Sequence, residues 1–262
     1  MHWRTAWLVG WTLGALVVSF SMGDTVFSHD LAKTLQGPSW LHPCGFDTFG
    51  RDLIPLVLHA SLLSIAFSLL SVISSMALGV GIGGALAVAP PALRTLCLRA
   101  LEGMLAFPSL MIALAWAAIR GPGWSTLIVA LFLGTLPGLT RLLYLRAQEV
   151  LTEEYIEAAI GLGADRFRIF SRYVTPELSR LSAVKFPSLF AQTLLAEATL
   201  SFLGIGAPIG QDTWGSLLAQ GKDYLIEAPH LAIATGIPLV ITVLALQGIS
   251  ERWELIGKRA LG

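Results

Sequence analysis

The hydrophobic positions of this chain are gathered into long runs that contain no charged residue. Such runs cover residues 5–23, 53–93, 103–119, 121–140 and 228–250. A further segment, residues 181–205, is apolar but carries Glu197. A helix of about 20 apolar residues is long enough to cross the hydrocarbon core of a membrane. The pattern therefore predicts six crossing helices, near residues 5–22, 60–89, 101–119, 124–145, 181–205 and 229–250.

Composition agrees with an all-α integral membrane protein. Hydrophobic residues make up 55% and charged residues 13% of the 262 positions, and the mean hydropathy is +0.71. Charged residues make up about 25% of an ordinary soluble domain, so this chain is too apolar for a soluble enzyme or a disordered segment. The 17 basic residues equal the 17 acidic residues in number, and without a basic excess we expect no nucleic-acid partner.

The distribution of Lys and Arg predicts the orientation in the membrane. With the N-terminus inside, every Lys and Arg lies in a cytoplasmic segment except Lys33, Arg51, Arg120 and Lys222. Because cytoplasmic loops carry the excess of basic residues, both termini are predicted to be cytoplasmic. The first apolar run lacks the Ala-x-Ala spacing of a cleavage site and is interpreted as a retained signal-anchor helix.

Cysteine and histidine positions indicate neither a disulfide nor a metal site. On the predicted topology Cys44 lies outside the membrane and Cys97 inside, so the two thiols should not pair within the chain. His42, His59 and His230 are scattered along the sequence without the paired spacing of metal ligands. We therefore expect no metal ion to be bound by this chain.

A predicted cytoplasmic segment, residues 152–178, begins with the signals of a short helix. Thr152 is a suitable N-cap, and acidic residues follow it in the first turn, where they interact favourably with the helix dipole. The helix is predicted over residues 153–162. It should end at Gly163, because glycine readily takes the left-handed C-cap conformation.

A second short helix is predicted over residues 166–174 of the same segment. Asp165 can cap this helix, and Pro176 should end it because proline removes a helix hydrogen bond. On the first helix, Ala158 and Ala159 remove side-chain bulk, so another protein can approach the backbone closely. The segment is interpreted as a helix–turn–helix at the membrane surface.

Five positions of segment 152–178 resemble the EAA loop of ABC importer permeases. The family pattern is E-A-A-x3-G-x9-I-x-L-P, and the residues that match it in register are Glu157, Ala158, Ala159, Gly163 and Pro176. The Ile and Leu positions of the pattern are Tyr173 and Thr175 here. The resemblance implies that these residues, together with Asp165, dock on a partner ATPase and carry its movement to the membrane helices.

Further motifs resemble the permeases of dipeptide, oligopeptide and nickel importers. Residues 42–52, HPCGFDTFGRD, resemble the H-P-x-G-T-D-x-x-G-R-D pattern of that family, with Phe46 in place of its Thr. The Gly and Arg of a following G-A-R-x-S-L pattern are missing at residues 59–64. Matches also occur at residues 106–108, 121–123, 197–204 and 214–215. The resemblance covers residues 41–262 and fits the second of the two permeases that these systems pair.

The resemblance implies a type I ABC importer permease in a bacterial inner membrane. Residues 1–56 would supply one crossing helix and a periplasmic loop, and residues 57–262 a core with five crossing helices. The implied partners are a second homologous permease, one or two ATPase subunits, a periplasmic or lipid-anchored substrate-binding protein, and the membrane lipid around the chain. ATP and Mg would bind to the ATPase subunits, and the chain itself would hold no cofactor and no catalytic residue.

Two further groups of residues are candidates for function. Glu197 is an acidic residue within a predicted crossing, where a charge is costly. It could face the pore or hydrogen-bond a neighbouring helix, and we favour the hydrogen bond. Ser201 and Pro108 are additional candidates for the pore or for helix interfaces.

The outer loop at residues 47–52 could fold over the outer mouth, help to dock a binding protein, or play a structural part. Its candidate residues are Asp47, Gly50, Arg51 and Asp52, and the three charged ones are expected to form an ion-pair network that fixes the loop. Of these interpretations we favour the structural one.

Three glycines, Gly79, Gly81 and Gly84, match the spacing of a dinucleotide-binding fingerprint. Such a fingerprint must follow a strand and open a soluble helix, whereas these glycines lie in a predicted crossing. We interpret them as small residues that allow close helix packing.

Other classes of function remain to be weighed against the importer hypothesis. An intramembrane enzyme needs a nucleophile and a base at one depth in the membrane, and no such pair is evident in the sequence. A self-contained secondary transporter or channel usually keeps several charges within its crossings, whereas Glu197 alone qualifies clearly. The solute stays open among peptides, nickel chelates and related small molecules.

Overall fold

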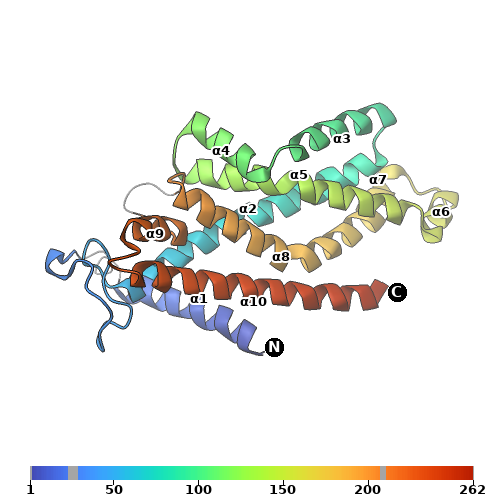
Figure 1. The fold of residues 1–262 in the computed structure, drawn as a ribbon. Coiled ribbons are helices and arrows are strands. Elements are labelled where there is room, and N and C mark those ends of the chain that lie inside the picture. Colours follow the sequence, from blue (N-terminus) through green and yellow to red (C-terminus); the bar gives the residue numbers. More distant parts are fainter. Residues whose placement is uncertain (1, 23–28, 207–210, 262) are drawn as a thin grey trace.

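The computed structural model describes residues 2–22, 29–206 and 211–261, and most of these residues are in helices (Figure 1). The long helices are α1 (His2–Met22), α2 (Leu53–Val88), α5 (Trp124–Leu151), α8 (Thr175–Phe202) and α10 (His230–Leu261). The shorter helices are α3 (Pro91–Leu105), α4 (Ser109–Arg120), α6 (Glu154–Gly161), α7 (Arg166–Ile169) and α9 (Trp214–Gly221). Short elements of other helical types are η2 (Leu31–Lys33), the π-helical η3 (Phe170–Val174) and η4 (Lys222–Tyr224). The all-α prediction is confirmed for the described residues.

Three helices are long and apolar enough to cross a membrane, namely α2, α5 and α10. Helices α3 and α4 would together provide a fourth span, bent by 87° at the break between them. The described residues therefore support three crossings, or four if the bent pair is one span. The crossings predicted at α1 and α8, and hence the count of six, stay predictions.

The continuous helix predicted near residues 101–119 is wrong. The chain forms α3, breaks at residues 106–108 and restarts as α4, so that the two helices form an open V (Figure 1). Proline lacks an amide hydrogen and disfavours helical backbone in the residue before it. Pro108 therefore stands before the first residue of α4 instead of continuing α3.

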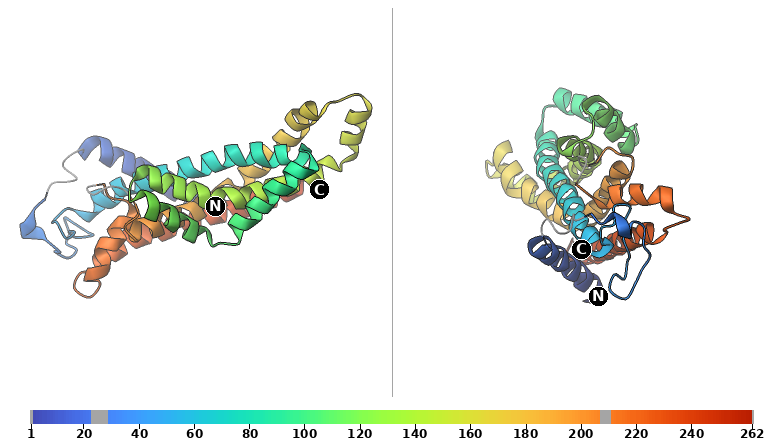
Figure 2. Two further views of the ribbon diagram at one scale, coloured as in Figure 1. Left: turned by 90° about the horizontal axis from the view of Figure 1, so that it is seen from above. Right: turned by 90° about the vertical axis from the view of Figure 1, so that its left-hand side faces the viewer.

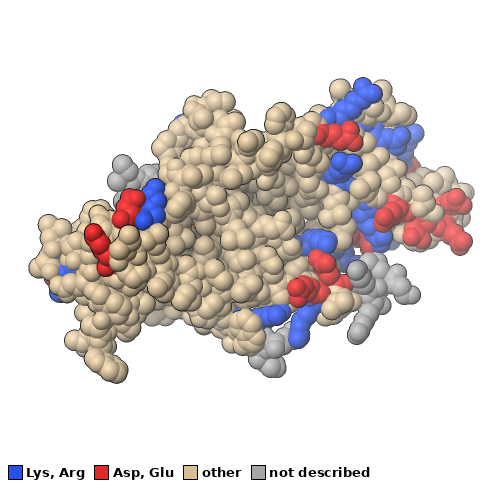
Figure 3. Space-filling model, viewed as in Figure 1, with Lys and Arg blue, Asp and Glu red and all other residues tan. Residues whose placement is uncertain are grey.

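Charged side chains gather at the two ends of the elongated bundle (Figure 3). The face shown there has a broad band between the ends that is almost free of charge. One end, here named the α9 end, holds α9 and residues 29–52, and the opposite end, named the α6 end, holds α6 (Figures 1 and 2). This arrangement is the one expected of a protein that crosses a hydrocarbon layer several times.

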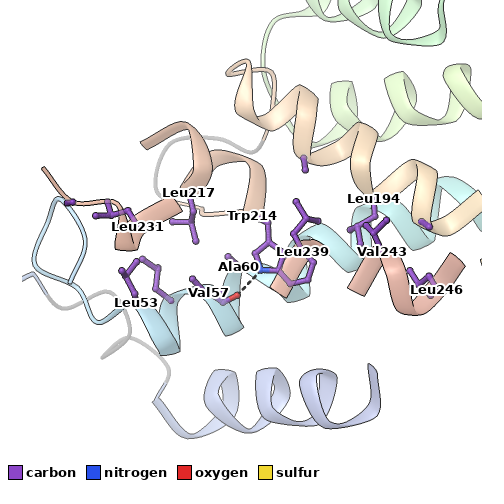
Figure 4. Packing of buried hydrophobic residues seen from close by; sticks show 14 residues of the cluster. Leu53, Val57, Ala60, Leu194, Trp214, Leu217, Leu231, Leu239, Val243 and Leu246 are labelled. Atoms are coloured by element: carbon purple, nitrogen blue, oxygen red, sulfur yellow. Dashed lines mark hydrogen bonds between the residues drawn. The ribbon is translucent and has the colours of Figure 1, made fainter. Parts of the chain in front are cut away.

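The core near the α9 end is built around Trp214 (Figure 4). Its buried indole Nε1 donates to the carbonyl oxygen of Val57 at 3.2 Å, and its backbone N–H donates to Ser64 Oγ at 3.0 Å. Leucine and alanine side chains from α2, α8 and α10 surround the ring. Helix α9 is too short to cross a membrane, and these contacts fix it against α2.

Helix α2 packs closely on its neighbours at glycine positions. A Cβ atom on Gly83 would lie 3.0 Å from Leu143 Cβ of α5, and one on Gly84 would lie 2.7 Å from Phe170 Cε2. The interpretation of this glycine-rich stretch as a packing surface is confirmed, except at Gly81, where an added Cβ atom would meet no atom of a neighbouring element within 4 Å.

Candidate functional site

Segment 152–178 projects from the α6 end of the bundle (Figures 1 and 2). After α6 the chain turns at Gly163, whose φ of +86° is a left-handed conformation that glycine adopts without strain. Asp165 then caps α7, and its Oδ1 accepts the Arg168 N–H at 2.8 Å. The local structure predicted for Gly163 and Asp165 is confirmed.

The start of α6 differs from the prediction. Thr152 Oγ1 donates to the carbonyl oxygen of Glu149 at 2.7 Å, so this hydroxyl bonds to the last turn of α5. Glu153 takes the N-cap position of α6, and no side chain there accepts a first-turn amide. Thr152 is not the N-cap because α5 continues to Leu151, beyond its predicted end, and uses the Thr152 hydroxyl itself.

The second short helix does not end before Pro176, as was predicted, but continues through η3 into α8. Both the backbone N–H and Oγ1 of Thr175 donate to the carbonyl oxygen of Phe170, the hydroxyl at 2.9 Å. This five-residue spacing is that of a π-helical turn. Pro176 lies in the first turn of α8, where proline is well tolerated. A continuous helical path therefore joins α7 to α8.

The surface of segment 152–178 carries exposed apolar side chains. Ile156 is buried in a cluster with residues of α5 and α8, which holds α6 to the bundle, and Ala159 of the same helix is also buried. Leu162 and Phe167, in contrast, are 89% and 75% exposed, and Ile160 is 55% exposed. Apolar groups concentrated on a projecting segment are typical of a surface that a partner protein covers.

The three EAA residues differ in their surroundings. Glu157 and Ala158 are exposed, whereas Ala159 is buried. Pro176 is exposed at the start of α8. The structure thus leaves Glu157 and Ala158 accessible on the projecting segment and buries Ala159.

An ion-pair cluster that the sequence analysis did not single out holds the base of this segment. Arg146 near the end of α5 pairs with Glu149 at 2.9 Å and with Glu177 of α8 at 2.7 Å. The i,i+3 spacing of Arg146 and Glu149 is a local signal that could have indicated the first pair. Glu177 lies 31 positions away in the sequence, and no local pattern indicates that contact.

A buried ion-pair cluster lies at the α9 end. Arg51 Nε is 2.6 Å from Asp47 Oδ2, and Arg51 Nη1 is 2.7 Å from Asp212 Oδ2. All three side chains are at most 8% exposed. Gln220 Nε2 also donates to Asp212 Oδ1 at 3.0 Å. The cluster joins the outer loop to the residues that precede α9, and the sequence analysis missed Asp212.

Asp52 takes partners other than those in the predicted network. Its Oδ1 accepts the Ile54 N–H and caps α2, and its Oδ2 is 2.5 Å from His42 Nδ1. Gly50 turns with a φ of +72°, and a Cβ atom there would clash with the carbonyl oxygen of Asp30. Across the described ranges, no three His, Cys, Asp or Glu side chains lie close enough together to hold a metal ion.

Glu197 and Ser201 lie inside the protein, between helices. Glu197 is 0% exposed, and its Oε1 accepts the Ser201 hydroxyl at 2.7 Å. The side chains of Ser64 and Thr213 lie beside the same carboxyl group. This placement favours the helix-interface interpretation of Glu197 and Ser201 over a place in the wall of a pore.

A groove of about 390 Å³ runs between α4, α5 and α8. Pro108 does not line the groove; it is exposed at the bend before α4, directly before the lining residue Ser109. Glycine, alanine and leucine residues form most of the wall, and the polar residues that line it are Ser109, Thr135, Lys185, Ser188, Gln192 and Thr193. The groove has the mixed polar and apolar lining of a site for small molecules.

Comparison with known proteins identifies the family of this chain. Residues 75–254 match the model of the family described as binding-protein-dependent transport system inner membrane component. A protein of Brucella suis biovar 1, provisionally named a peptide transport system permease, is 36% identical over 216 residues, covering 82% of this chain and 73% of the relative. The di/tripeptide transport system permease protein DppC of Pseudomonas aeruginosa is 32% identical over 218 residues, covering 81% and 72%. The glutathione transport system permease protein GsiD of Pectobacterium atrosepticum is 30% identical over 228 residues, covering 87% and 75%.

These matches confirm the resemblance carried by the EAA and outer-loop motifs. The matched family consists of transport permeases and not of enzymes. Together with the apolar helices, the matches also confirm the coarse prediction of a multi-pass protein of the bacterial inner membrane. The chain belongs to the family of inner-membrane components of binding-protein-dependent transport systems and is similar to DppC-type peptide permeases.

Proposed function

We propose that the chain is one permease subunit of an ATP-driven ABC importer and couples to ATPase subunits through segment 152–178. The observation that carries this proposal is the exposed apolar surface of that segment, to which the exposed side chains of Leu162 and Phe167 belong. Burial of such side chains in a partner stabilises a complex, whereas their exposure to water is unfavourable. The helical path through η3 provides a mechanical connection from that surface to α8.

The partners and orientation follow from this assignment. ATPase subunits, identical or different, would bind ATP and Mg and contact the α6 end from the cytoplasm. A periplasmic or lipid-anchored substrate-binding protein would deliver solute at the α9 end. Both chain termini would then be cytoplasmic, with six crossings that include α1 and α8. Closure of the ATPases on ATP would shift the permease pair between its two access states.

A short peptide is the solute that we propose. The relatives described above are named for peptides, for di- and tripeptides and for glutathione. Nickel chelates and related small solutes rank behind peptides, because they rest on the sequence resemblance alone. The groove between α4, α5 and α8 would be the part of the translocation pathway that this chain lines. A second homologous permease would cover the groove from the other side.

Co-purification tests the proposal directly. The chain carries a C-terminal tag, native membranes are solubilised gently, and the co-purified proteins are identified by mass spectrometry. We expect a homologous permease together with one or two P-loop ATPases. A stable complex that contains neither would overturn the proposal and favour a self-contained transporter or channel.

A charge reversal at Glu157 tests the coupling role. Glu157→Lys should abolish ATP-driven uptake or release the ATPases, because Glu157 lies on the exposed surface of α6. Glu227→Lys is the matched control, since Glu227 is exposed at the opposite end of the bundle. Normal uptake and normal stimulation of ATPase activity in the Glu157→Lys variant would contradict the coupling role.

A further inference from the structure

The groove between α4, α5 and α8 has one charged side chain in its wall. Lys185 of α8 lines the groove with a side chain that is 33% exposed, and the other lining residues are neutral. The groove volume of about 390 Å³ lies within the range of about 300–1,000 Å³ typical of small-molecule sites. A cation in a wall that contains no carboxylate favours a negatively charged occupant.

The counterion of Lys185 lies outside the groove. Glu254 of α10 is not part of the groove wall, and its Oε1 is 2.9 Å from Lys185 Nζ. Both side chains are about one-third exposed, so the pair is only partly removed from water. Ion pairs of this kind contribute little net stability, and an ammonium group has three donors. Lys185 can therefore donate a hydrogen bond to a second carboxylate on the groove side.

Helix α8 presents neutral polar groups beside Lys185 along the same wall. Ser188 and Gln192 follow at spacings of three and four residues, which place all three on one helix face. Gln192 Nε2 donates to Ser188 Oγ at 3.1 Å, so hydroxyl and amide groups lie together there. Leu110 and Leu131 supply apolar wall from α4 and α5. The lining suits a small molecule that combines a carboxylate, amide groups and apolar side chains.

We propose that Lys185 binds the carboxylate of the transported solute, and that this carboxylate replaces Glu254 as the ion-pair partner of Lys185 while the solute passes. This inference rests on the proposed function and names the solute class as small amide-containing carboxylates, such as short peptides. Lys185 lies ten residues into α8, about 15 Å along the helix axis from its start. Helix α8 is continuous with the projecting segment. A movement of α8 relative to α10 therefore changes how well Glu254 competes with the solute for Lys185.

Uptake of a radiolabelled dipeptide by cells that contain the complete importer tests the exchange. Lys185→Met should lower uptake by about tenfold or more in an assembled complex, because the solute carboxylate loses its partner. Lys185→Arg keeps the positive charge and should retain most uptake. Glu254→Gln removes the competing carboxylate but keeps the cation in the groove wall, so uptake should fall less than in Lys185→Met.

A charge-swapped variant separates solute binding from a structural ion pair. Lys185→Glu combined with Glu254→Lys restores the pair but moves the positive charge out of the groove wall, so uptake should stay low while the complex assembles. Recovery of uptake in this variant, or equal losses in Lys185→Met and Glu254→Gln, would overturn the inference. A wild-type importer that assembles with its ATPases but takes up neither dipeptide nor glutathione would overturn the proposed peptide transport itself, and the inference with it.

Discussion

Arg51 and Asp212 form a buried ion pair of 2.7 Å between residues that lie 161 positions apart in the sequence. The same guanidinium also binds Asp47, so one cation serves two carboxylates at a site closed to water. The pair connects the outer loop to the residues that lead into α9. Since Trp214 of α9 is itself packed on α2, the outer loop, α9 and α2 are held together at the α9 end.

Loss of Arg51 should destabilise the protein strongly. Arg51→Met leaves two carboxylates buried without their cation, and breaking one side of a buried pair costs about 3–5 kcal/mol. We expect a clear fall in the Tm of the detergent-solubilised protein. Lys33→Met is the matched control, because Lys33 forms an exposed pair with Asp30 at 3.1 Å and its loss should change the Tm little. Equal Tm values for the two variants would contradict this account of the α9 end.

The contact between α8 and α9 should not tolerate a methyl group at Gly215. A Cβ atom there would lie 2.2 Å from the carbonyl oxygen of Ala198, so Gly215→Ala must push α9 away from α8. Overpacking of this kind costs about 1–3 kcal/mol, and the Tm should fall. Gly81→Ala is the control, since no atom lies within 4 Å of the added methyl group and alanine favours a helix. A Tm unchanged by Gly215→Ala would show that α9 can move without loss of stability.

Local signals in the sequence were sufficient where the structure depends on a few neighbouring residues. The charge-free runs predicted α2, α5 and α10, because span length and hydrophobicity are properties of one segment. Asp165 and Gly163 were assigned correctly because a cap or a left-handed turn is fixed within a few residues. The EAA and outer-loop motifs likewise identified the family.

The prolines show what the local sequence does not predict, namely whether a helix continues or breaks. Pro137, Pro187 and Pro238 lie inside continuous helices, whereas Pro108 stands at a break with an 87° bend. The same residue type gives both outcomes, so the outcome depends on the tertiary surroundings of each proline and not on the residue type alone. For the same reason the sequence could not reveal that α4, α5 and α8 enclose a groove, or that Asp212 completes the cluster with Arg51.

The two cysteines can report the orientation in the membrane. A membrane-impermeant maleimide added to intact spheroplasts should label Cys44 and should reach Cys97 only after permeabilisation. Burial, and secondarily the negative charge of Asp52, raises the pKa of the Cys44 thiol above its ordinary value. The thiolate is the reactive form, so labelling should be slow at about pH 7 and faster at about pH 9. A Cys44→Ser variant gives the background, and labelling of Cys97 in intact spheroplasts would reverse the predicted topology.

Substitution of Gly163 should weaken coupling more than it weakens the fold. Its φ of +86° is unfavourable for residues with a Cβ atom, by about 1–2 kcal/mol, but no other atom lies within 4 Å of an added methyl group. Gly163→Ala should therefore lower the Tm modestly, through backbone strain without a steric clash, while it alters the turn between α6 and α7 and lowers ATP-driven uptake more strongly. Gly163→Asn should retain more uptake, because asparagine tolerates the left-handed conformation. Gly161→Ala is the control within α6, where the added methyl group also meets no atom within 4 Å. If Gly163→Ala and Gly161→Ala transport equally well, the left-handed turn is not required to pass movement from α6 to α8.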